Sequence, residues 1–346
     1  MRAKLISLAT AVPRHRLDTG EVVREAAAVF AGRHVDFERL RPVFVNSGIL
    51  TRYSVRPYDW FRGNQGWPER TAAFIDGATA LFREAGEKAL ALAAVAAAEI
   101  DAIIMVSSTG IATPSIEARV LHEMGFRSDV QRVPVFGLGC AGGVTGLSLA
   151  ARLAVSAPGS KVLLVVIELC TLAFRPDEMS KSNIIATALF GDGAAAAVLS
   201  TAGGGLSEIE HGGEHTWPGT LDIMGWRMDP QGFGAIFSQS IPELVRRDLR
   251  SAADRFMASC HLDWPDIAQR SFHPGGARVI AALEEAFELA EGTLAHERAV
   301  LADYGNMSAA TVLFVLARAL ADGQRGRRFV SSLGPGFTAS FATMLQ

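Results

Sequence analysis

The chain has 346 residues, of which 49% are hydrophobic and 20% are charged, and its net charge at pH 7 is −3. This length exceeds what one small core can hold and fits one large domain or two fused domains of a compact protein. Because the sequence has no concentrated basic stripe, we do not expect nucleic-acid binding. Its longest apolar runs, such as Leu90–Ala98, reach about half of a membrane span, so we expect no integral membrane segment.

The cysteine pattern indicates the redox compartment of the protein and argues against a metal site. Cys140, Cys170 and Cys260 lie far apart and form no CxxC pair, which argues against a disulfide framework and against a zinc or other metal site. The reducing cytoplasm is therefore the expected location. Residues 1–12 superficially resemble a signal peptide, but Pro13–Arg16 follow at once and favour a first β-strand and a turn.

Two helices are predicted before the first central strands. One runs from Gly20 to about Leu40 and has a single apolar face. The segment Trp60–Gly66 is aromatic and glycine-rich, which indicates a surface loop. A long alanine-rich helix follows from about Thr71 to Ala98, and Gly86 indicates a break within it.

Short apolar runs of the length of buried strands then alternate with helices. Helices are expected from Ser115 to Met124 and from Ala141 to about Val155, and the second is apolar on nearly all sides and therefore central. The strand-like runs are Asp101–Ser108, Arg132–Phe136, Lys161–Glu168 and the end of Ala188–Leu199. This alternation predicts an α/β protein. A nucleotide-cradling loop at Gly191–Gly193 is disfavoured, because the residues there match neither GxGxxG nor GxxxxGK[ST], and no nucleotide-type cofactor is expected.

The run Val135–Gly143 carries the candidate nucleophile. A short apolar segment ends in a tight glycine turn, which places Cys140 where a long helix begins. Unpaired N–H groups and the positive end of the peptide dipoles at a helix start favour the thiolate form of a cysteine, which attacks carbon. The alternative is a buried cysteine that packs as a small hydrophobic residue.

The second half of the chain looks like a variation on the first. Thr201–Gly205 is the best boundary, which divides the chain into residues 1–205 and 206–346. Asp303–Met307 opens a helix as Gly139–Ala141 does, and an ungapped comparison places Asn306 on Cys140. The match predicts that these two residues occupy equivalent helix N-termini and face one site.

Three polar side chains stand at element ends marked by glycine or proline: Cys140, His273 and Asn306. Taken singly, His273 fits a loop histidine with satisfied hydrogen bonds, and Asn306 fits a helix cap. The three together favour a catalytic site over three coincidences.

Five blocks of the sequence resemble the signatures of type III polyketide synthases, the chalcone and stilbene synthase family, in a bacterial form. They are Gly137–Gly143, Ala188–Ala195, His273–Gly276, Tyr304–Ala310 and Gly334–Thr338. The resemblance spans the chain from its first strand to its C-terminus. It implies the thiolase fold, with two related α/β halves in a layered αβαβα arrangement, a homodimer, and no cofactor, since CoA thioesters are the substrates.

By this resemblance, Cys140 carries the acyl group, and His273 and Asn306 complete a catalytic triad. His273 is expected to stabilise the thiolate as an ion pair and then to offer an N–H group. Asn306 is expected to offer an N–H group without charge. When malonyl-CoA loses carbon dioxide, negative charge moves onto the thioester oxygen, and two donors aimed at that oxygen lower the barrier.

The resemblance also implies substrate contacts. Phe190 and Phe237 match phenylalanines between the CoA tunnel and the reaction cavity, although core packing is the alternative for both. Four residues fall where the walls of the cavity or of the dimer interface vary: Ser108, Thr113, Cys170 and Ala173. The C-terminal block Gly334, Pro335, Gly336 departs from the usual Gly-Phe-Gly-Pro-Gly. The lysine-rich mouth for CoA is absent, and three arginines are its candidate substitutes or an ordinary solvated face: Arg39, Arg41 and Arg278.

The implied function is a type III polyketide synthase. It loads an acyl-CoA starter on Cys140, extends it by repeated decarboxylative condensation with malonyl-CoA, and cyclises the chain to a pyrone or a resorcinol-type ring. One alternative is a ketoacyl synthase III-like enzyme that condenses once and takes malonyl from a carrier protein. The other is a catalytically silent acyl-CoA-binding protein of the same fold.

Overall fold

The computed structural model describes residues 1–30, 37–63 and 65–346, without the side chains of residues 37–40. The described strands are β1 (Ala3–Ala11), β2 (His15–Asp18), β3 (Thr51–Ser54), β4 (Ala102–Val106), β5 (Gln131–Val135), β6 (Lys161–Leu169), β7 (Asp192–Ser200), β8 (Ser207–Thr216), β9 (Met224–Asp229), β10 (Gly232–Phe237), β11 (Ile267–Phe272), β12 (Arg327–Gly334) and β13 (Thr338–Leu345).

The described α-helices are α1 (Thr19–Phe30), α2 (Phe37–Val45), α3 (Tyr58–Arg62), α4 (Trp67–Ala93), α5 (Ile116–Val120), α6 (Gly142–Ser156), α7 (Lys181–Leu189), α8 (Ile241–Leu244), α9 (Arg250–Ser259), α10 (Ala277–Ala286), α11 (Ala295–Tyr304) and α12 (Thr311–Ala321). Short 3-10 helices cover Ala97–Glu99, Gly139–Ala141, Cys170–Ala173, Trp264–Asp266 and Ser308–Ala310, and a π-helical turn covers Val245–Leu249.

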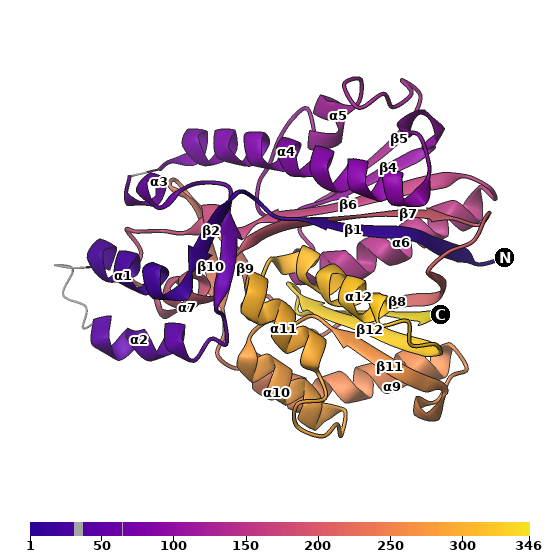
Figure 1. The fold of residues 1–346 in the computed structure, drawn as a ribbon. Helices are drawn as coiled ribbons and strands as arrows, with labels where there is room; N and C mark the ends of the chain where they lie inside the picture. Colours follow the sequence, from indigo (N-terminus) through magenta and orange to yellow (C-terminus); the bar gives the residue numbers. More distant parts are fainter. Residues whose placement is uncertain (31–36, 64) are drawn as a thin grey trace.

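Nine of these strands form one mixed sheet in the order β11-β12-β13-β8-β1-β7-β6-β4-β5. Figure 1 shows β4 and β5 at the top of the molecule and β11 and β12 towards the bottom. The first five in the chain come from residues 3–200, and the other four come from residues 207–345. The two sets meet only where Ala3–Leu5 of β1 pair with Ser207–Ile209 of β8. The strand pairs β9–β10 and β2–β3 stand apart from this sheet.

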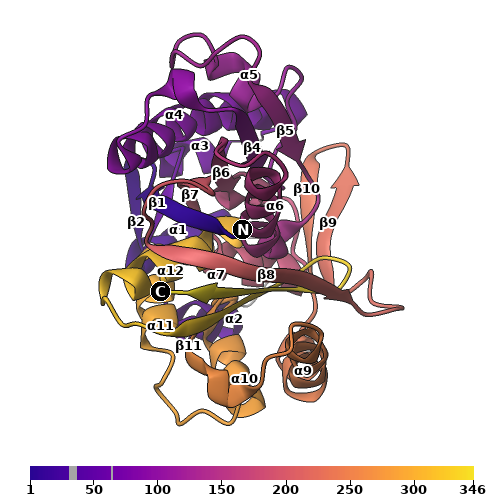
Figure 2. The same cartoon turned by 90° about the vertical axis from the view of Figure 1, so that its right-hand side faces the viewer.

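Helices and strands alternate in five layers. Helices α6 and α12 lie in the centre and share one apolar core with β6 and β7 on one side and with β12 and β13 on the other. Helices α4 and α5 cover the opposite face of β4, β6 and β7. Helices α9 and α10 cover the outer face of β11–β13, and Figure 2 shows these outer helices above and below the strands. This is the αβαβα arrangement that the sequence resemblance implies.

The residue pattern accounts for the central layers. Every residue of β6 after Lys161 is buried, as is every residue of β7, which is the pattern of strands with helices on both faces. Successive residues serve opposite cores: Leu164 packs on the α6 side, and Leu163 packs on the α4 side. The same order of elements follows both glycine turns, since a 3-10 helix, a buried helix and a strand come after Cys140 and after Asn306.

The close packing of α6 against the 3-10 helix Ser308–Ala310 and the start of α12 depends on glycine at position 143. A Cβ atom on Gly143 would overlap the carbonyl oxygen of Ala309 and lie 2.8 Å from Cγ1 of Val312. Gly143→Ala is therefore expected to lower the free energy of unfolding by about 1–3 kcal/mol, the usual cost of overpacking. Gly204→Ala is the matched control, because a Cβ there meets nothing within 4 Å. Equal denaturant midpoints for the two variants would contradict the expectation.

Some sequence-based boundaries are wrong. The residues expected as a surface loop at Trp60–Gly66 include the end of α3, whose Phe61 ring packs edge-on against Phe174 at 6.0 Å. Helix α4 continues through Gly86, because that position is buried against the methyl end of Met124 and packing outweighs glycine's weak helix propensity. Of the helix expected at 115–124, only Ile116–Val120 form an α-helix, which is α5.

The first predicted helix, Gly20 to Leu40, also differs from the structure. Helix α1 ends at Phe30, and α2 begins at Phe37. Residues 31–36 lie outside the described part of the chain. Among the described residues, no helix combines the length and the hydropathy needed to cross a membrane.

Candidate active site

Cys140 lies in the 3-10 turn between β5 and α6 and is 6% exposed. The turn needs glycine before the cysteine, because Gly139 has φ +48° and a Cβ there would lie 2.5 Å from Cδ of Pro335. The Gly139 N–H donates to the hydroxyl of Ser108 at 2.9 Å. These contacts hold the backbone that presents the thiol.

Short contacts link Cys140 to the other two predicted triad residues. The side chain of Ser308 lowers the pKa of the thiol and lines the same chamber, and the Ser308 backbone N–H donates to Oδ1 of Asn306 at 2.8 Å. The Asn306 amide nitrogen donates to the carbonyl of Gly275 at 3.1 Å. The Gly275 N–H in turn donates to the carbonyl of His273 at 3.1 Å. The structure therefore joins the three residues in one connected cluster, and their catalytic roles stay a prediction.

The imidazole of His273 is buried yet has unused hydrogen-bonding capacity. The residue is 5% exposed, and neither Nδ1 nor Nε2 has a hydrogen-bond partner among the described residues. The Asn306 amide carries two N–H groups, and one of them is used by Gly275. Buried polar groups without partners are uncommon, so these donors are suited to a ligand that supplies an oxygen.

Burial favours uncharged forms of both groups. It raises the pKa of Cys140 to about 12, and the charge of Glu168 raises it further, while the hydrogen bond with Ser308 opposes the shift. Burial also lowers the pKa of His273 to about 3. Burial therefore opposes the thiolate and the charged histidine that the sequence predicts, since desolvation disfavours the charged form of each group.

Glu168 is a site residue that the sequence interpretation missed. It is the second-last residue of β6 and is fully buried, and its Oε2 accepts hydrogen bonds from the Ser108 N–H at 3.0 Å and the Thr109 hydroxyl at 2.9 Å. Burial raises the pKa of this carboxyl to about 7, although those hydrogen bonds and others from Ser308 and Ala309 oppose the shift. The available signal was a single carboxylate at the end of an otherwise apolar strand.

These pKa values predict how the reactivity of Cys140 depends on pH. Alkylation requires the thiolate, so its rate should rise with pH towards a pKa of about 12. Glu168 ionises near pH 7 and adds negative charge beside the thiol, so the rise should be less than tenfold per pH unit there. In Glu168→Gln the pKa of Cys140 falls, and alkylation at pH 8 should be faster.

The measurement is alkylation of Cys140 followed by mass spectrometry of its peptide between pH 6 and pH 10, with Cys260 in the same sample as an internal reference. A plateau beginning near pH 6 would contradict the expectation, because it would indicate a thiolate–imidazolium pair.

A small chamber opens beside the thiol. It encloses roughly 410 Å³ of empty space including its mouth, and it is lined by Gly139, Cys140, Phe190, Met224, Gly225, Trp226, Ala235, Ile236, Phe237, Ser308 and Pro335. The structure therefore gathers four predicted residues on one cavity: Cys140, Phe190, Phe237 and Pro335. The two phenylalanine rings lie edge-on with centroids 6.5 Å apart. Their place between a CoA tunnel and the chamber stays a prediction.

Trp226 was also missed. Its ring lies edge-on to Phe190 with centroids 5.9 Å apart, and its indole N–H donates to the carbonyl of Ser108 at 2.7 Å. Sequence periodicity gave no reason to select this tryptophan, because its place in the chamber wall depends on how β9 and β10 pack.

Cys170 lines a second, apolar cavity. This cavity has about 640 Å³ of space when the open solvent at its mouth is included, shares Phe190 with the chamber, and is bounded by Phe174 and by side chains of α1. The charge of a Cys140 thiolate would raise the pKa of Cys170. Ala173 is buried in the same 3-10 turn as Cys170.

The remaining predicted positions are scattered. Gly334 ends β12 against the backbone of Leu138–Ala141, and the Gly336 carbonyl accepts a hydrogen bond from Thr220 at 2.9 Å. Thr113 is exposed in the loop after β4. The candidate arginines for CoA divide as follows: Arg41 and Arg278 are exposed on α2 and α10, and the side chain of Arg39 lies outside the described part of the chain.

Comparisons with known proteins cover the whole chain. Residues 61–203 match the N-terminal domain of chalcone and stilbene synthases, and residues 208–342 match the C-terminal domain. A putative chalcone synthase of Bacillus subtilis is 34% identical over 353 residues, or 97% of each protein. A 1,3,6,8-tetrahydroxynaphthalene synthase of Streptomyces peucetius is 36% identical over 345 residues, or 97% of this chain and 91% of that protein.

A solved structure shows the same fold. The crystal structure of 1,3,6,8-tetrahydroxynaphthalene synthase from Streptomyces coelicolor, described as a bacterial type III polyketide synthase, superposes with a TM-score of 0.93 at 28% identity and covers 99% of both chains. The layered thiolase-like fold expected from the sequence is thereby confirmed.

Proposed function

We propose that Cys140 accepts an acyl group from an acyl-CoA starter and that malonyl-CoA extends it. The basis is that this chain belongs to the chalcone and stilbene synthase family and is a type III polyketide synthase. The observation that carries this assignment is the pair of unpartnered ring nitrogens on buried His273. The backbone of His273 is linked to the Asn306 amide through Gly275.

Acyl loading follows from the neutral resting forms. As the thioester approaches, His273 takes the proton of Cys140, and the sulfur attacks the thioester carbonyl. The carbon–sulfur bond to CoA breaks, and the leaving thiolate recovers the proton from the imidazolium. The products are an acyl-Cys140 thioester and free CoA, and His273 is neutral again.

Extension uses the same donors. When malonyl-CoA binds, its carboxylate leaves as carbon dioxide, and the electron pair moves onto the thioester oxygen as an enolate. N–H groups of His273 and Asn306 stabilise that oxygen. The enolate carbon attacks the acyl-Cys140 carbonyl, the Cys140 thiolate leaves, and the chain is two carbons longer and attached to CoA. Return of this chain to Cys140 permits another round.

The starter is proposed to carry an apolar acyl group. The second cavity supports this, because it is largely apolar and shares Phe190 with the chamber. The extended chain is then released by ring closure as a pyrone or a resorcinol-type product. The relatives named as tetrahydroxynaphthalene synthases make a naphthalene product the main competitor.

We propose a homodimer in the cytoplasm, with halves 1–205 and 206–346. Strand β5 is one of the two edge strands of the sheet, and the next residue, Phe136, is 47% exposed. Ile111, in the loop after β4, is 50% exposed. A second copy could cover an apolar edge of this kind. The three cysteines are free thiols, which suits a reducing compartment. Light scattering should give twice the chain mass, and Phe136→Asp should shift it towards the monomer.

The assay is incubation of the purified protein with malonyl-CoA and a series of acyl-CoA starters, without carrier protein, followed by product mass spectrometry. The expected result is a set of products that grow by two carbons for each malonyl-CoA consumed. Dependence on a malonyl carrier protein, or a single condensation, would contradict the proposal and favour a ketoacyl synthase.

A further inference from the structure

The β9–β10 hairpin forms part of the chamber wall but belongs to neither set of sheet strands. Its two strands pair only with each other. An isolated two-stranded hairpin is marginally stable in water, so its position must be fixed by contacts on its two faces. These contacts therefore control the chamber that Trp226 and Phe237 line.

The register of the hairpin separates an apolar face from a charged face. Met224 and Trp226 line the chamber, and the alternate residues Arg227 and Asp229 point to the other side. Gly234 is paired with Arg227, and a Cβ on this glycine would lie 2.8 Å from Nη2 of Arg227. The glycine thus leaves room for charged groups behind the chamber wall.

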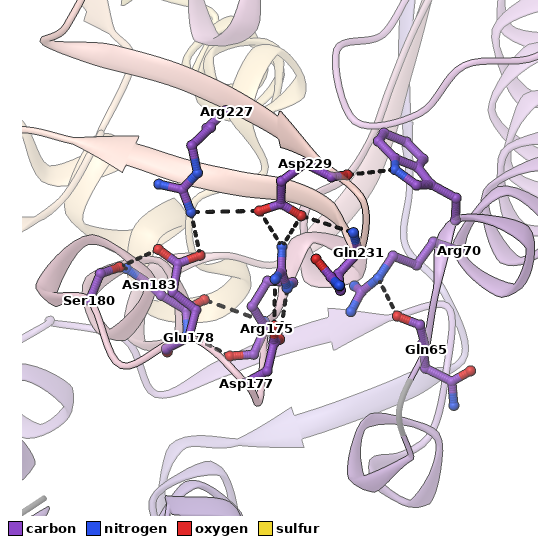
Figure 3. Close-up of polar contacts among 11 residues, drawn as sticks. Gln65, Arg70, Arg175, Asp177, Glu178, Ser180, Asn183, Arg227, Asp229 and Gln231 are labelled. Atoms are coloured by element: carbon purple, nitrogen blue, oxygen red, sulfur yellow. Dashed lines mark hydrogen bonds and ion pairs between the residues drawn. The ribbon is translucent and has the colours of Figure 1, made fainter.

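The charged face is bound by Arg175, as Figure 3 shows. Arg175 is 4% exposed, and its Nη1 donates to both carboxylate oxygens of Asp229 at 2.8 and 2.9 Å. Its Nε and Nη2 donate to the two oxygens of Asp177 at 2.8 and 2.5 Å. Arg227 adds a hydrogen bond to Glu178 at 3.0 Å. A planar guanidinium is suited to hold two carboxylates in a fixed geometry.

The loop that carries Arg175 is itself fixed to α7. The Asn183 amide nitrogen donates to the carbonyls of Arg175 and Glu178, both at 2.7 Å, and the Ser180 hydroxyl donates to Glu178 at 2.7 Å. Helix α7 ends just before Phe190. One polar network (Figure 3) therefore connects the hairpin that carries Trp226 to the helix that carries Phe190.

We propose that Arg175 is a positioning residue that sets the size of the chamber beside Cys140 by holding the β9–β10 hairpin in place. Trp226 closes the chamber only while the hairpin holds the Trp226 ring at its present distance from the Phe190 ring, with centroids 5.9 Å apart. The effect on polyketide length rests on the proposed function, and the effect on the hairpin does not.

The first test measures the hairpin and the chamber without substrate. In Arg175→Gln, amide hydrogen exchange should increase several-fold within residues 224–237 and stay unchanged in α6 and β6. Alkylation of Cys140 by a bulky aryl maleimide should accelerate several-fold relative to iodoacetamide. Arg175→Lys keeps the positive charge but lacks the planar guanidinium that binds two carboxylates. It should restore part of the wild-type ratio of maleimide to iodoacetamide alkylation. Asp229→Asn, which is nearly isosteric, provides the same test if Arg175→Gln does not fold.

Arg246→Gln is the matched control, because Arg246 forms a two-point pair with Glu285 on an exposed surface, at 2.5 and 3.1 Å. It should leave the exchange and the alkylation ratio unchanged. Unchanged values in Arg175→Gln and Asp229→Asn would overturn the proposal. So would a uniform rise in exchange over the whole chain, which would indicate a stabilising role only.

The second test uses the polyketide assay. Arg175→Gln should convert the principal wild-type product into a broader set that includes chains with additional malonyl-derived units. A wild-type distribution with a lower total yield would overturn the proposed control of chain length. If the wild-type protein forms no polyketide, the proposed function fails, and the exchange and alkylation results still decide whether Arg175 positions the hairpin.

Discussion

Cys140→Ala is expected to abolish polyketide formation, a loss on the order of 10⁶-fold by comparison with other covalent nucleophiles. The proposed cycle forms the new carbon–carbon bond only at the acyl-Cys140 thioester, so no alternative route to a longer chain remains. The measurement is intact-protein mass spectrometry after incubation with an acyl-CoA. The wild-type protein should gain the mass of one acyl group, and the variant should gain none.

Cys260→Ala is the control for this experiment. Cys260 is partly exposed beside α9, away from the chamber lining, and its replacement should leave the acyl adduct in place. An adduct that persists in Cys140→Ala would show that another residue carries the acyl group, and it would remove the basis of the proposed chemistry.

His273→Ala is expected to slow the decarboxylation of malonyl-CoA by about 10²–10³-fold, the usual effect of removing one donor to a developing oxyanion. Neither ring nitrogen has a partner among the described residues, so the substitution breaks no hydrogen bond of that side chain within the described structure. The fold should therefore persist, and the loss can be assigned to the missing donor and proton acceptor. Release of labelled carbon dioxide is the measurement.

Asn306→Asp tests the second donor with almost no change in shape. Oδ1 can still accept the Ser308 N–H, but a carboxylate oxygen replaces the amide nitrogen that faces the carbonyl of Gly275. A negative charge here opposes the enolate, so this variant should be at least as slow as His273→Ala. Near-normal carbon dioxide release from either variant would contradict the assigned roles.

The fold, and the turns that carry the three predicted catalytic residues, could be predicted from the sequence for a definite reason. Glycine and proline mark the ends of elements, and Cys140, His273 and Asn306 each follow or precede such a mark, so their turns could be located without coordinates. The central helix after Cys140 could also be predicted, because it is apolar on nearly all sides. The family blocks then supplied the arrangement of layers.

The missed features depend on contacts between distant segments. Glu168 has the pattern of a strand end, and its buried environment arises from Ser108, Thr109 and the turn after Asn306. The effect of burial on the pKa of Cys140 could not be predicted, because a helix start is visible in sequence, whereas complete desolvation is a property of the packed site. Trp226 joins the chamber only through the placement of a separate hairpin.

The narrow junction between the two sets of strands has a consequence for synthesis on the ribosome. Ala3 in β1 pairs with Ile209 in β8, and Lys4 pairs with Ser200 in β7. At about 5–20 residues per second, the first strand to emerge waits about 10–40 s for its partners. We therefore expect the nascent N-terminal segment to be a binding site for chaperones until both partners are made.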